Sequence, residues 1–211
     1  MMNNYIHNER LYFWKQQNND VTGMMCNPDA AEFETFERAE IISYLPDLKE
    51  KQVLEPAAGI GRFTVYFASV AKHVTAVDFV DEFIEKNKKA CFCFSNTTHH
   101  VGNVMELNFK NASFDFVFIN WLLMYLEDVE VRTLCDRIYQ WLKPNGLFFL
   151  RESCVSASNP NRTHPHTYYR NPNFYIDLFI TKYRLLSHGN IRVYEQKYQN
   201  PYQLWWLYEK I

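Results

Sequence analysis

Short apolar runs alternate with longer segments of mixed polarity between Lys51 and Gly146. Each run has the length of one buried strand, and the intervening segments carry apolar residues at the spacing of a helix face. A chain that alternates in this way folds into βα units, whose parallel strands form one sheet covered by helices. The predicted strands are 52–55, 74–78, 99–102, 114–119 and 147–150, and the predicted crossover helices are 63–70, 81–90 and 129–142.

Segments at both ends add to this βα core. Residues 8–17 and 29–45 have helical spacing, so two helices are expected before the first strand. After the fifth strand, residues 153–173 are rich in Ser, Asn, Pro, His and Tyr and show no periodicity, which is typical of a long functional loop.

The last forty residues are predicted to close the sheet. A helix is expected over 172–183, followed by strands over 191–195 and 202–208. A turn at Gln199-Asn200-Pro201 would join the two strands. No repeat or linker interrupts the sequence, so a single domain over 1–211 is expected.

Composition limits the classes of partner. The net charge is −2 with both signs mixed along the chain, so no basic stripe is present and nucleic acid is not expected as a partner. No run approaches the roughly 18 apolar residues that cross a bilayer, and the first residues lack the pattern of a secretory leader. Five scattered cysteines indicate free thiols rather than a disulfide framework. We therefore expect a cytoplasmic protein without membrane insertion, and a monomer.

A glycine-containing loop, Glu55-Pro56-Ala57-Ala58-Gly59-Ile60-Gly61-Arg62, follows the first predicted strand and opens a helix. Bare backbone and helix N-terminal N–H groups can approach a ligand closely in such a loop. Asp78 ends the second strand, at the spacing of an acid that accepts hydrogen bonds from ribose hydroxyls. The structural alternatives are a plain tight turn for the glycines and a helix N-cap for Asp78.

Two kinds of nucleotide-binding protein share these features. The dinucleotide fingerprint has a third glycine, and this chain has none where it is required, because Gly61 is followed by Arg62-Phe63-Thr64. Two closing strands after the fifth are more typical of methyltransferases, whose sheet ends in an antiparallel hairpin. Dinucleotide binding is therefore the second choice.

Three longer motifs are more specific than the glycine loop: Asn120-Trp121-Leu122-Leu123-Met124-Tyr125-Leu126, Arg151-Glu152-Ser153-Cys154, and Thr167-Tyr168-Tyr169-Arg170 followed by Asn171-Pro172. They resemble the methyltransferase domain at the N-terminus of plant and nematode phosphoethanolamine N-methyltransferases. The resemblance covers nearly the whole chain. It also includes Phe13-Trp14, Met24-Met25, 59–64, 77–79 and 206–210.

The resemblance implies a Rossmann-like class I methyltransferase fold, an α/β architecture with a seven-stranded, mostly parallel sheet, an antiparallel last strand and helices on both faces. It implies S-adenosylmethionine as methyl donor, with S-adenosylhomocysteine as product. The implied acceptor is phosphoethanolamine, a small phosphorylated amine on the way to phosphocholine. Residues 1–45 would then form a helical lid, 51–152 the cofactor-binding core, and 153–211 the substrate loop, helix and closing strands. A single domain of this kind would favour the first methylation.

The acceptor's phosphate requires strong donors. Arginine pairs bidentately with two phosphate oxygens, and tyrosine donates one hydroxyl. Arg151, Arg170, Tyr168 and Tyr169 supply such groups in or beside the 153–173 loop. For Arg151 an ion pair with Glu152 is the structural alternative, and for Arg170 a solvated loop charge.

The acceptor's amine must lose a proton before its lone pair can attack. If its pKa resembles that of lysine, holding it neutral at pH 7 costs about 4.5 kcal/mol. Tyr125, after the fourth strand, is the first candidate to orient the amine or to relay its proton, with His164 and His166 in the loop as alternatives. The structural alternative for Tyr125 is an ordinary core residue.

Aromatic faces can stabilise a sulfonium or a methylammonium by cation–π attraction, each by about 1 kcal/mol. Phe13, Trp14 and Trp121 are the candidates, Trp14 as a catalytic residue and the other two as substrate-binding residues. No metal is expected, because the clustered histidines lack further ligands at useful spacing. The residues expected to bind the cofactor are Glu55, Ala57, Gly59, Gly61, Arg62, Asp78, Phe79, Asn103, Val104 and Asn120.

The chain departs from the family's pattern at four places. Pro56-Ala57 stands where an apolar residue and a glycine are usual, and Asn103 stands where an acid usually follows the third strand. Tyr168 replaces a histidine, and Phe13 replaces a tyrosine. Two alternatives therefore stay open beside a phosphoethanolamine N-methyltransferase. One is a methyltransferase of the same fold acting on another small amine or acid, and the other is a non-catalytic relative that binds a ligand or partner.

Overall fold

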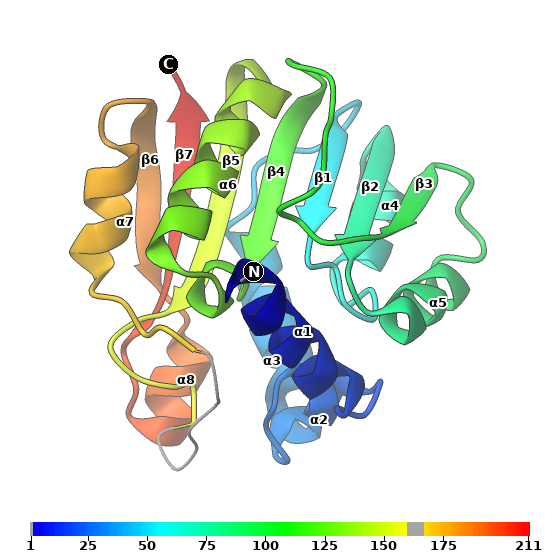
Figure 1. Cartoon of the computed structure of the whole chain (residues 1–211), viewed down its shortest axis with the longest axis vertical. Coiled ribbons are helices and arrows are strands. Elements are labelled where there is room, and N and C mark those ends of the chain that lie inside the picture. Colours follow the sequence, from blue (N-terminus) through cyan, green and yellow to red (C-terminus); the bar gives the residue numbers. More distant parts are fainter. Residues whose placement is uncertain (1, 160–166) are drawn as a thin grey trace.

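The computed structural model describes residues 2–159 and 167–211, with 2–6 described by their backbone alone. Seven strands form one sheet in the order β3-β2-β1-β4-β5-β7-β6 (Figure 1). Strands β1 to β5 pair in parallel, whereas β7 runs antiparallel to both β5 and β6. The predicted mostly parallel sheet with an antiparallel last strand is confirmed. The strands are β1 Gln52–Pro56, β2 His73–Asp78, β3 Thr97–Val101, β4 Phe114–Asn120, β5 Leu142–Ser153, β6 Tyr183–Asn190 and β7 Gln203–Lys210.

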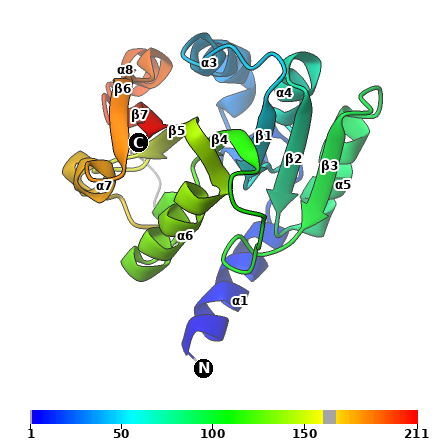
Figure 2. The same cartoon turned by 90° about the horizontal axis from the view of Figure 1, so that it is seen from above.

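Helices cover both faces of the sheet. Helices α6 and α7 lie on one side, and α3, α4 and α8 lie on the other (Figure 2). A separate apolar cluster fills the space under each of these layers. The helices are α1 Met2–Lys15, α2 Val21–Met24, α3 Ala30–Ser43, α4 Thr64–Val70, α5 Asp81–Ala90, α6 Asp128–Trp141, α7 Pro172–Phe179 and α8 Arg192–Tyr198, with a 3-10 turn η1 at Leu123–Tyr125.

Local sequence explains where several elements begin. Helix α6 starts with a reciprocal capping box, in which the Glu127 side chain accepts from the backbone of Glu130 and the Glu130 side chain accepts from the backbone of Glu127. Helix α7 starts with Asn171 accepting from the Asn173 N–H and with Pro172 in its first turn. Strand β4 has four consecutive buried residues, Phe116 to Ile119, as a central parallel strand requires.

The prediction for the C-terminal region was wrong in one element. Residues 191–195 form the end of a connection and the start of helix α8, not a strand, and the strand beside β7 is β6. Strand β6 lies at the edge of the sheet and most of its side chains are exposed, so it lacks the apolar pattern of a core strand. Helix α8 is fixed by a long-range contact, because both carboxylate oxygens of Glu40 accept backbone N–H groups at its start, from Arg192 and Val193.

Helix α1 lies at the carboxyl ends of the central strands β1 and β4 (Figure 1). In open parallel sheets, ligands bind at this edge, where the strand order reverses. The order reverses here between β1 and β4: strands β2 and β3 follow on one side of β1, and strands β5, β7 and β6 follow on the other side of β4. The fold thus places the loops after β1, β2 and β4 under helix α1.

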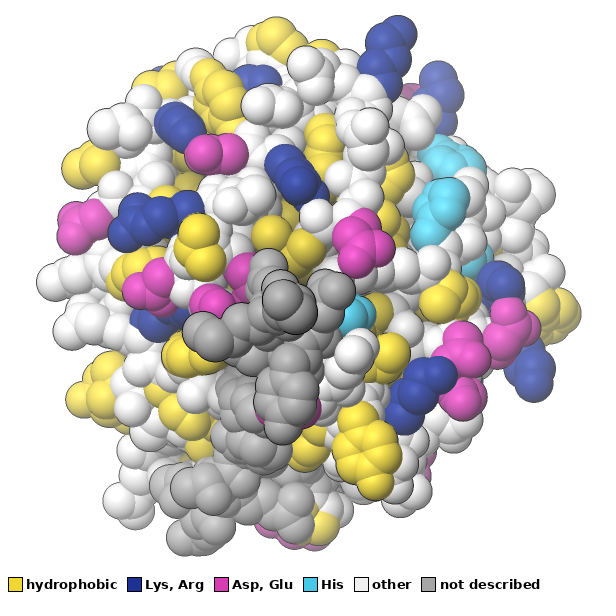
Figure 3. All heavy atoms as spheres, in the orientation of Figure 1, with side chains coloured by type: hydrophobic (Ala, Val, Ile, Leu, Met, Phe, Trp, Pro, Cys, Tyr) yellow, Lys and Arg dark blue, Asp and Glu magenta, His cyan; other side chains and the backbone are white. Residues whose placement is uncertain are grey.

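On the face drawn in Figure 3, positive and negative side chains are interspersed among the described residues. In residues 2–159 and 167–211, no helix has the length and apolar character that crossing a membrane requires. Over the same ranges, no group of three or more His, Cys, Asp or Glu side chains is arranged to hold a metal ion.

Candidate active site

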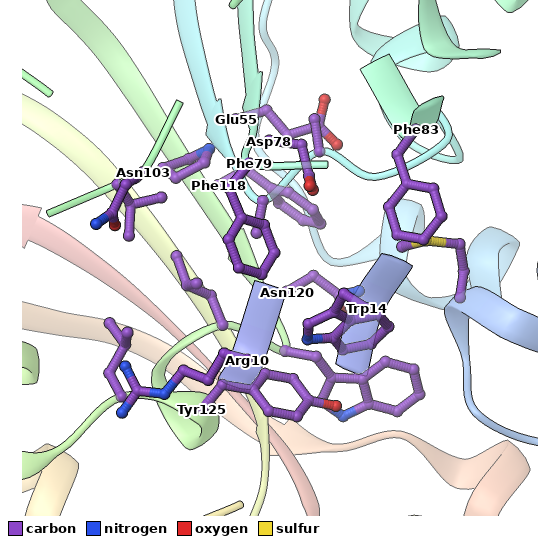
Figure 4. Close-up of a pocket in the computed structure, with 18 of the residues that line it drawn as sticks. Arg10, Trp14, Glu55, Asp78, Phe79, Phe83, Asn103, Phe118, Asn120 and Tyr125 are labelled. Atoms are coloured by element: carbon purple, nitrogen blue, oxygen red, sulfur yellow. The ribbon is translucent and has the colours of Figure 1, made fainter. Parts of the chain in front are cut away.

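A cavity opens at the carboxyl ends of β1, β2 and β4, with helix α1 along one wall (Figure 4). It holds about 1080 Å³ of space that protein atoms do not fill, part of it open to solvent. A cavity at this edge of a parallel sheet, lined by apolar side chains with a few polar groups, is the usual place of a small-molecule site. The residues that line this cavity include His7, Arg10, Trp14, Met24, Glu55, Ala57, Arg62, Asp78, Phe79, Phe83, Asn103, Val104, Phe118, Asn120, Trp121, Leu122, Tyr125, Leu126 and Glu130.

The glycine loop needs its glycines because of close packing and backbone conformation. Gly59 has φ of 53°, and a Cβ there would lie 2.2 Å from the Met24 Cε. Gly61 has φ of 92°, and a Cβ there would lie 2.8 Å from the Asn87 Oδ1. Ala57 shares the left-handed conformation, with φ of 58°, and carries a methyl group all the same. Met24 and Asn87 therefore pack tightly against the loop, and Ala57 is the residue with a strained backbone conformation.

Asp78 connects the loop to the second strand. Its Oδ2 accepts the Gly59 N–H at 2.9 Å and its Oδ1 accepts the Val80 N–H at 3.0 Å. Burial raises the pKa of Asp78 to about 6, against the lowering effect of these backbone hydrogen bonds. Each carboxylate oxygen has lone-pair capacity for a further donor, such as a ligand hydroxyl. The alternative role as the N-cap of helix α5 was wrong, because Val80 is the N-cap and no side chain caps that helix.

Glu55 ends strand β1 at the floor of the cavity. Its Oε2 accepts from the Thr64 hydroxyl at 2.6 Å, and the Asn87 amide in turn donates to Thr64 at 2.8 Å. Burial raises the pKa of Glu55 to about 8, with the neighbouring Asp78 charge adding to the shift. Glu55 is thus largely protonated at neutral pH and can donate a hydrogen bond as well as accept one.

The turn after β4 is held from two sides by buried charges. The Glu152 carboxylate accepts the N–H groups of Leu122, Leu123 and Met124, at 3.0, 2.6 and 3.2 Å. Burial raises the pKa of Glu152 to about 7, opposed by these three backbone donors.

Arg170 holds the same turn from its carbonyl side. It donates to the Leu123 carbonyl at 2.7 Å and to the Leu126 carbonyl, and its Nε donates to the Asp128 carboxylate at 2.8 Å. Oppositely charged side chains thus bind the N–H and C=O groups of one short turn, and that turn carries Tyr125.

Tyr125 projects from η1 into the cavity and meets the edge of Trp14, with 5.2 Å between ring centroids. Burial raises the pKa of Tyr125 well above its ordinary value, so the side chain is a neutral phenol at physiological pH. A phenol can donate one hydrogen bond and accept another. That suits orientation of an amine better than direct removal of its proton by a phenolate.

Arg151 is fully buried behind the cavity wall. Its guanidinium carbon lies 3.5 Å from the centroid of the Trp121 ring, and its Nη2 lies 3.3 Å from the Glu37 Oε1. Glu37 also pairs with Arg62. Arg151 therefore has an ion-pair partner from α3, rather than Glu152, and it supports Trp121, which lines the cavity with φ of 56°.

The structure brings together eleven of the predicted site residues as cavity lining: Trp14, Glu55, Ala57, Arg62, Asp78, Phe79, Asn103, Val104, Asn120, Trp121 and Tyr125. The predicted residues that do not line it are Phe13, Gly59, Gly61, Arg151, Tyr168, Tyr169 and Arg170. His166 lies outside the described residues, as does His164. Gly59 and Gly61 shape the loop without facing the cavity, and Tyr168 is joined to the η1 turn through its N–H, which donates to the Met124 carbonyl at 2.7 Å.

Several lining residues were missed by the sequence reasoning. His7, Arg10 and Trp14 recur at intervals of three and four residues along α1, so the position of Trp14 on a helix face was the signal for the other two. Phe83, Phe118 and Glu130 carried no such signal, because each has the pattern of an ordinary core or capping residue.

A sheet of this order, with a cavity at its switch point, a glycine loop after β1 and an acid after β2, has the architecture of the class I methyltransferases. A family model described as a methyltransferase domain matches residues 54–150. The matched residues include the loops after β1, β2 and β4, which form the cavity. The chain therefore has the fold of the class I methyltransferases, and residues 54–150 match the methyltransferase domain model.

Comparison of sequence and of structure finds relatives whose names specify a reaction. Phosphoethanolamine N-methyltransferase 1 of Triticum aestivum is 39% identical over 217 residues, covering 94% of this chain and 43% of that protein. Phosphoethanolamine N-methyltransferase 3 of Arabidopsis thaliana is 37% identical over 215 residues, covering 94% and 44%. The structure of Haemonchus contortus phosphoethanolamine N-methyltransferase 1, in complex with phosphoethanolamine and S-adenosylhomocysteine, matches with a TM-score of 0.89 and 31% identity, covering 99% of this chain and 48% of that one. This chain is thus a relative of the phosphoethanolamine N-methyltransferases, and it spans about half the length of the relatives it matches.

Proposed function

We propose that this chain is an S-adenosylmethionine-dependent N-methyltransferase that acts on phosphoethanolamine. The observation that carries the proposal is the cavity in which the glycine loop, Asp78 and Tyr125 meet. The relatives named for this reaction match nearly the whole chain, which supports the choice of donor and acceptor.

The residues of the cavity fit the donor. Asp78 has lone-pair capacity for ribose hydroxyls, and Phe79, Asn103 and Val104 form an apolar and amide-lined pocket suited to a flat base. The Asn120 Oδ1 is buried and has no hydrogen-bond partner in the described part of the chain, so it can accept from an ammonium group. When bound, S-adenosylmethionine supplies the methyl group on its sulfonium.

The protein's part in the transfer is to hold the amine in line with that methyl group and to accept or relay the proton that the amine must lose before its lone pair attacks. The nitrogen forms a bond to the methyl carbon while the carbon–sulfur bond breaks, and one amine proton must leave. The Tyr125 hydroxyl orients the amine lone pair, and the proton passes to solvent or to a loop histidine such as His166. Trp14 and Trp121 present aromatic faces to the cationic groups. Positioning of this kind can contribute several kcal/mol to rate acceleration, on the order of 5 kcal/mol or more.

Tyr168, Tyr169, Arg151 and Arg170 were predicted to bind the phosphate end of the acceptor, and none of them lines the cavity. In the present arrangement Arg151 and Arg170 are engaged by protein groups. Either arginine would have to exchange those partners to reach a phosphate.

Calorimetry with S-adenosylmethionine tests the donor half of the proposal, and binding is expected at micromolar concentration. Absence of binding up to millimolar donor would reject every methyltransferase interpretation and leave the non-catalytic relative. If the donor binds, transfer of labelled methyl groups to phosphoethanolamine, ethanolamine and related amines tests the acceptor. Faster transfer to another amine would support the alternative acceptor, for which Phe13 and Tyr168 are the motivating departures.

Three properties belong to the same proposal. We propose that the protein acts without nucleic acid, on the basis of its mixed charge, and that it is a monomer in the cytoplasm. Light scattering after size-exclusion chromatography tests the monomeric state, and the expected mass is that of one 25.3 kDa chain.

A further inference from the structure

Arg10 lines the cavity from helix α1 with 6% of its surface exposed. Its Nη1 donates to the Glu130 Oε2 at 2.8 Å. Its Nε and Nη2 have no hydrogen-bond partner within the described residues. A buried donor without an acceptor is destabilising, and more so when it is charged. Two such donors on one side chain, at the wall of a cavity, indicate a ligand that accepts from both.

The geometry of the guanidinium group defines the kind of ligand. Nε and Nη2 form one edge of the planar fork and point two parallel N–H bonds in the same direction. Such an edge matches two oxygens of a phosphate or a carboxylate. Neutral acceptors with a single lone pair would satisfy only half of it.

Glu130 holds the fork in place. Its Oε2 accepts from Arg10 and also from the backbone N–H of Glu127, at 2.8 Å, within the capping box of helix α6. The ion pair is therefore anchored to the start of a helix, and both partners are buried. Because Glu130 occupies Nη1, the Nε and Nη2 edge is left available in a fixed orientation.

The other arginines near the cavity are committed elsewhere. Arg62 uses Nε and Nη2 for Glu34 and Glu37. Arg170 uses its nitrogens for the η1 turn and for Asp128, and it does not line the cavity. The nitrogens of Arg151 also have no hydrogen-bond partner within the described residues, but Arg151 is fully buried, pairs with Glu37 and does not line the cavity. Of the two arginines that line the cavity, Arg10 therefore presents the guanidinium edge that is available to a ligand.

We propose that Arg10 binds the acceptor's phosphate through Nε and Nη2, and so sets the preference for a phosphorylated amine over the free amine. This inference rests on the proposed function. Figure 4 draws Arg10 with Tyr125 on one side of the cavity and Glu55 with Asp78 on the other. The phosphate would thus bind on the side of the candidate amine-orienting residue, away from the acids that suit the donor's ribose.

Arg10→Gln tests the inference, with Lys15→Gln as the matched control. Lys15 lies on the same helix in an exposed ion pair with Asp81 and does not line the cavity, so its variant removes one positive charge from α1 alone. A charge-assisted bond contributes about 1.5–3 kcal/mol, so Arg10→Gln should raise the KM for phosphoethanolamine at least about tenfold. The Kd for S-adenosylmethionine should stay within about twofold, and kcat/KM for ethanolamine should be unchanged. The Lys15 variant should match the wild type in the KM for phosphoethanolamine, the Kd for S-adenosylmethionine and kcat/KM for ethanolamine.

Two outcomes would overturn the inference. An equal loss of donor affinity would mean that the fork binds the donor's carboxylate, and an equal loss of kcat/KM on both acceptors would mean that Arg10 only holds α1 in place. Inorganic phosphate, titrated in the presence of S-adenosylhomocysteine, separates the inference from the proposed function. If the wild type binds phosphate at least about tenfold more tightly than Arg10→Gln but does not methylate phosphoethanolamine, the function fails and the anion site stands. If the wild type binds no phosphate, the inference is wrong.

Discussion

Ala57 occupies a left-handed backbone conformation in the glycine loop, where its Cβ carries strain of roughly 1 kcal/mol. Ala57→Gly should therefore stabilise the protein by about 0.5–1 kcal/mol and keep or improve its affinity for the donor. Ala112→Gly is the matched control, because Ala112 has a similar φ of 53° in an exposed turn away from the cavity. Both variants should gain stability in chemical denaturation. In calorimetry, donor affinity should be unchanged for Ala112→Gly and equal or higher for Ala57→Gly. Weaker donor binding by Ala57→Gly would show that the methyl group contributes to the site.

Asp78 binds two backbone N–H groups and keeps capacity for a ligand hydroxyl. Asp78→Ala should weaken donor binding at least about tenfold, because hydrogen bonds to a charged carboxylate contribute about 1.5–3 kcal/mol. Asp81→Ala, three residues further on and exposed, is the control and should leave donor binding unchanged. An unaltered dissociation constant for Asp78→Ala would contradict its role at the ribose.

At the scale of single residues, the sequence identified the loop and the acid after the second strand because spacing along βα units determines which groups reach one edge of the sheet. It could not assign the arginines. Whether Arg151 faces a ligand or Glu37 depends on how helix α3 packs on the sheet, and no local pattern encodes that contact. Arg10 was missed for the same reason, since its partner Glu130 is 120 residues away.

Among the elements, the η1 turn is the one whose position the buried charges control. Glu152 binds the N–H groups of Leu122, Leu123 and Met124. Arg170 binds the carbonyls of Leu123 and Leu126, and the turn between these contacts presents Tyr125 to the cavity. Glu152→Gln replaces one acceptor oxygen by an amide donor that opposes a backbone N–H. It should lower kcat about tenfold or more by displacing Tyr125, while donor affinity changes little.

A double-mutant cycle with Tyr125→Phe separates positioning from general loss of structure. If Glu152 acts through the Tyr125 hydroxyl, Glu152→Gln should reduce kcat much less in the Tyr125→Phe background than in the wild type. Fully additive losses would contradict the positioning role. Asp128→Asn is the control for the Arg170 side, because Asp128 is exposed and does not bind the turn itself.

Strands and helices with their own pattern were predicted well, as the five core strands and the helix after β4 show. Strand β6 and helix α8 were not predicted from the sequence. The edge strand has a single neighbour and few buried side chains, and the start of α8 is stabilised by Glu40 from α3. Elements whose stability comes from distant partners leave little trace in their own sequence.

For the whole molecule, buried acids make stability depend on pH. Burial raises the pKa of Glu55 to about 8 from its ordinary 4.5, so folding favours the protonated form. The stabilisation from this group is fully present below about pH 4.5 and is lost as the pH rises through about 8. Asp78 and Glu152, with pKa values raised to about 6 and about 7, act in the same direction.

Glu55→Gln removes this ionisation and should keep the hydrogen bond from Thr64. Relative to the wild type, its stability should increase between about pH 5 and about pH 9 by at least about 1 kcal/mol. Thermal or denaturant unfolding across that range measures the difference, with Glu50→Gln at an exposed position as the control. A difference that is independent of pH would mean that Glu55 ionises normally in the folded protein.

The central claim is that one cavity brings a methyl donor and phosphoethanolamine together. The most direct test is to incubate the protein with S-adenosylmethionine and phosphoethanolamine and to quantify both products by mass spectrometry. We expect N-methylated phosphoethanolamine and S-adenosylhomocysteine in equal amounts, with ethanolamine a poor acceptor. Donor binding without methylation of phosphoethanolamine, or faster methylation of ethanolamine, would contradict it.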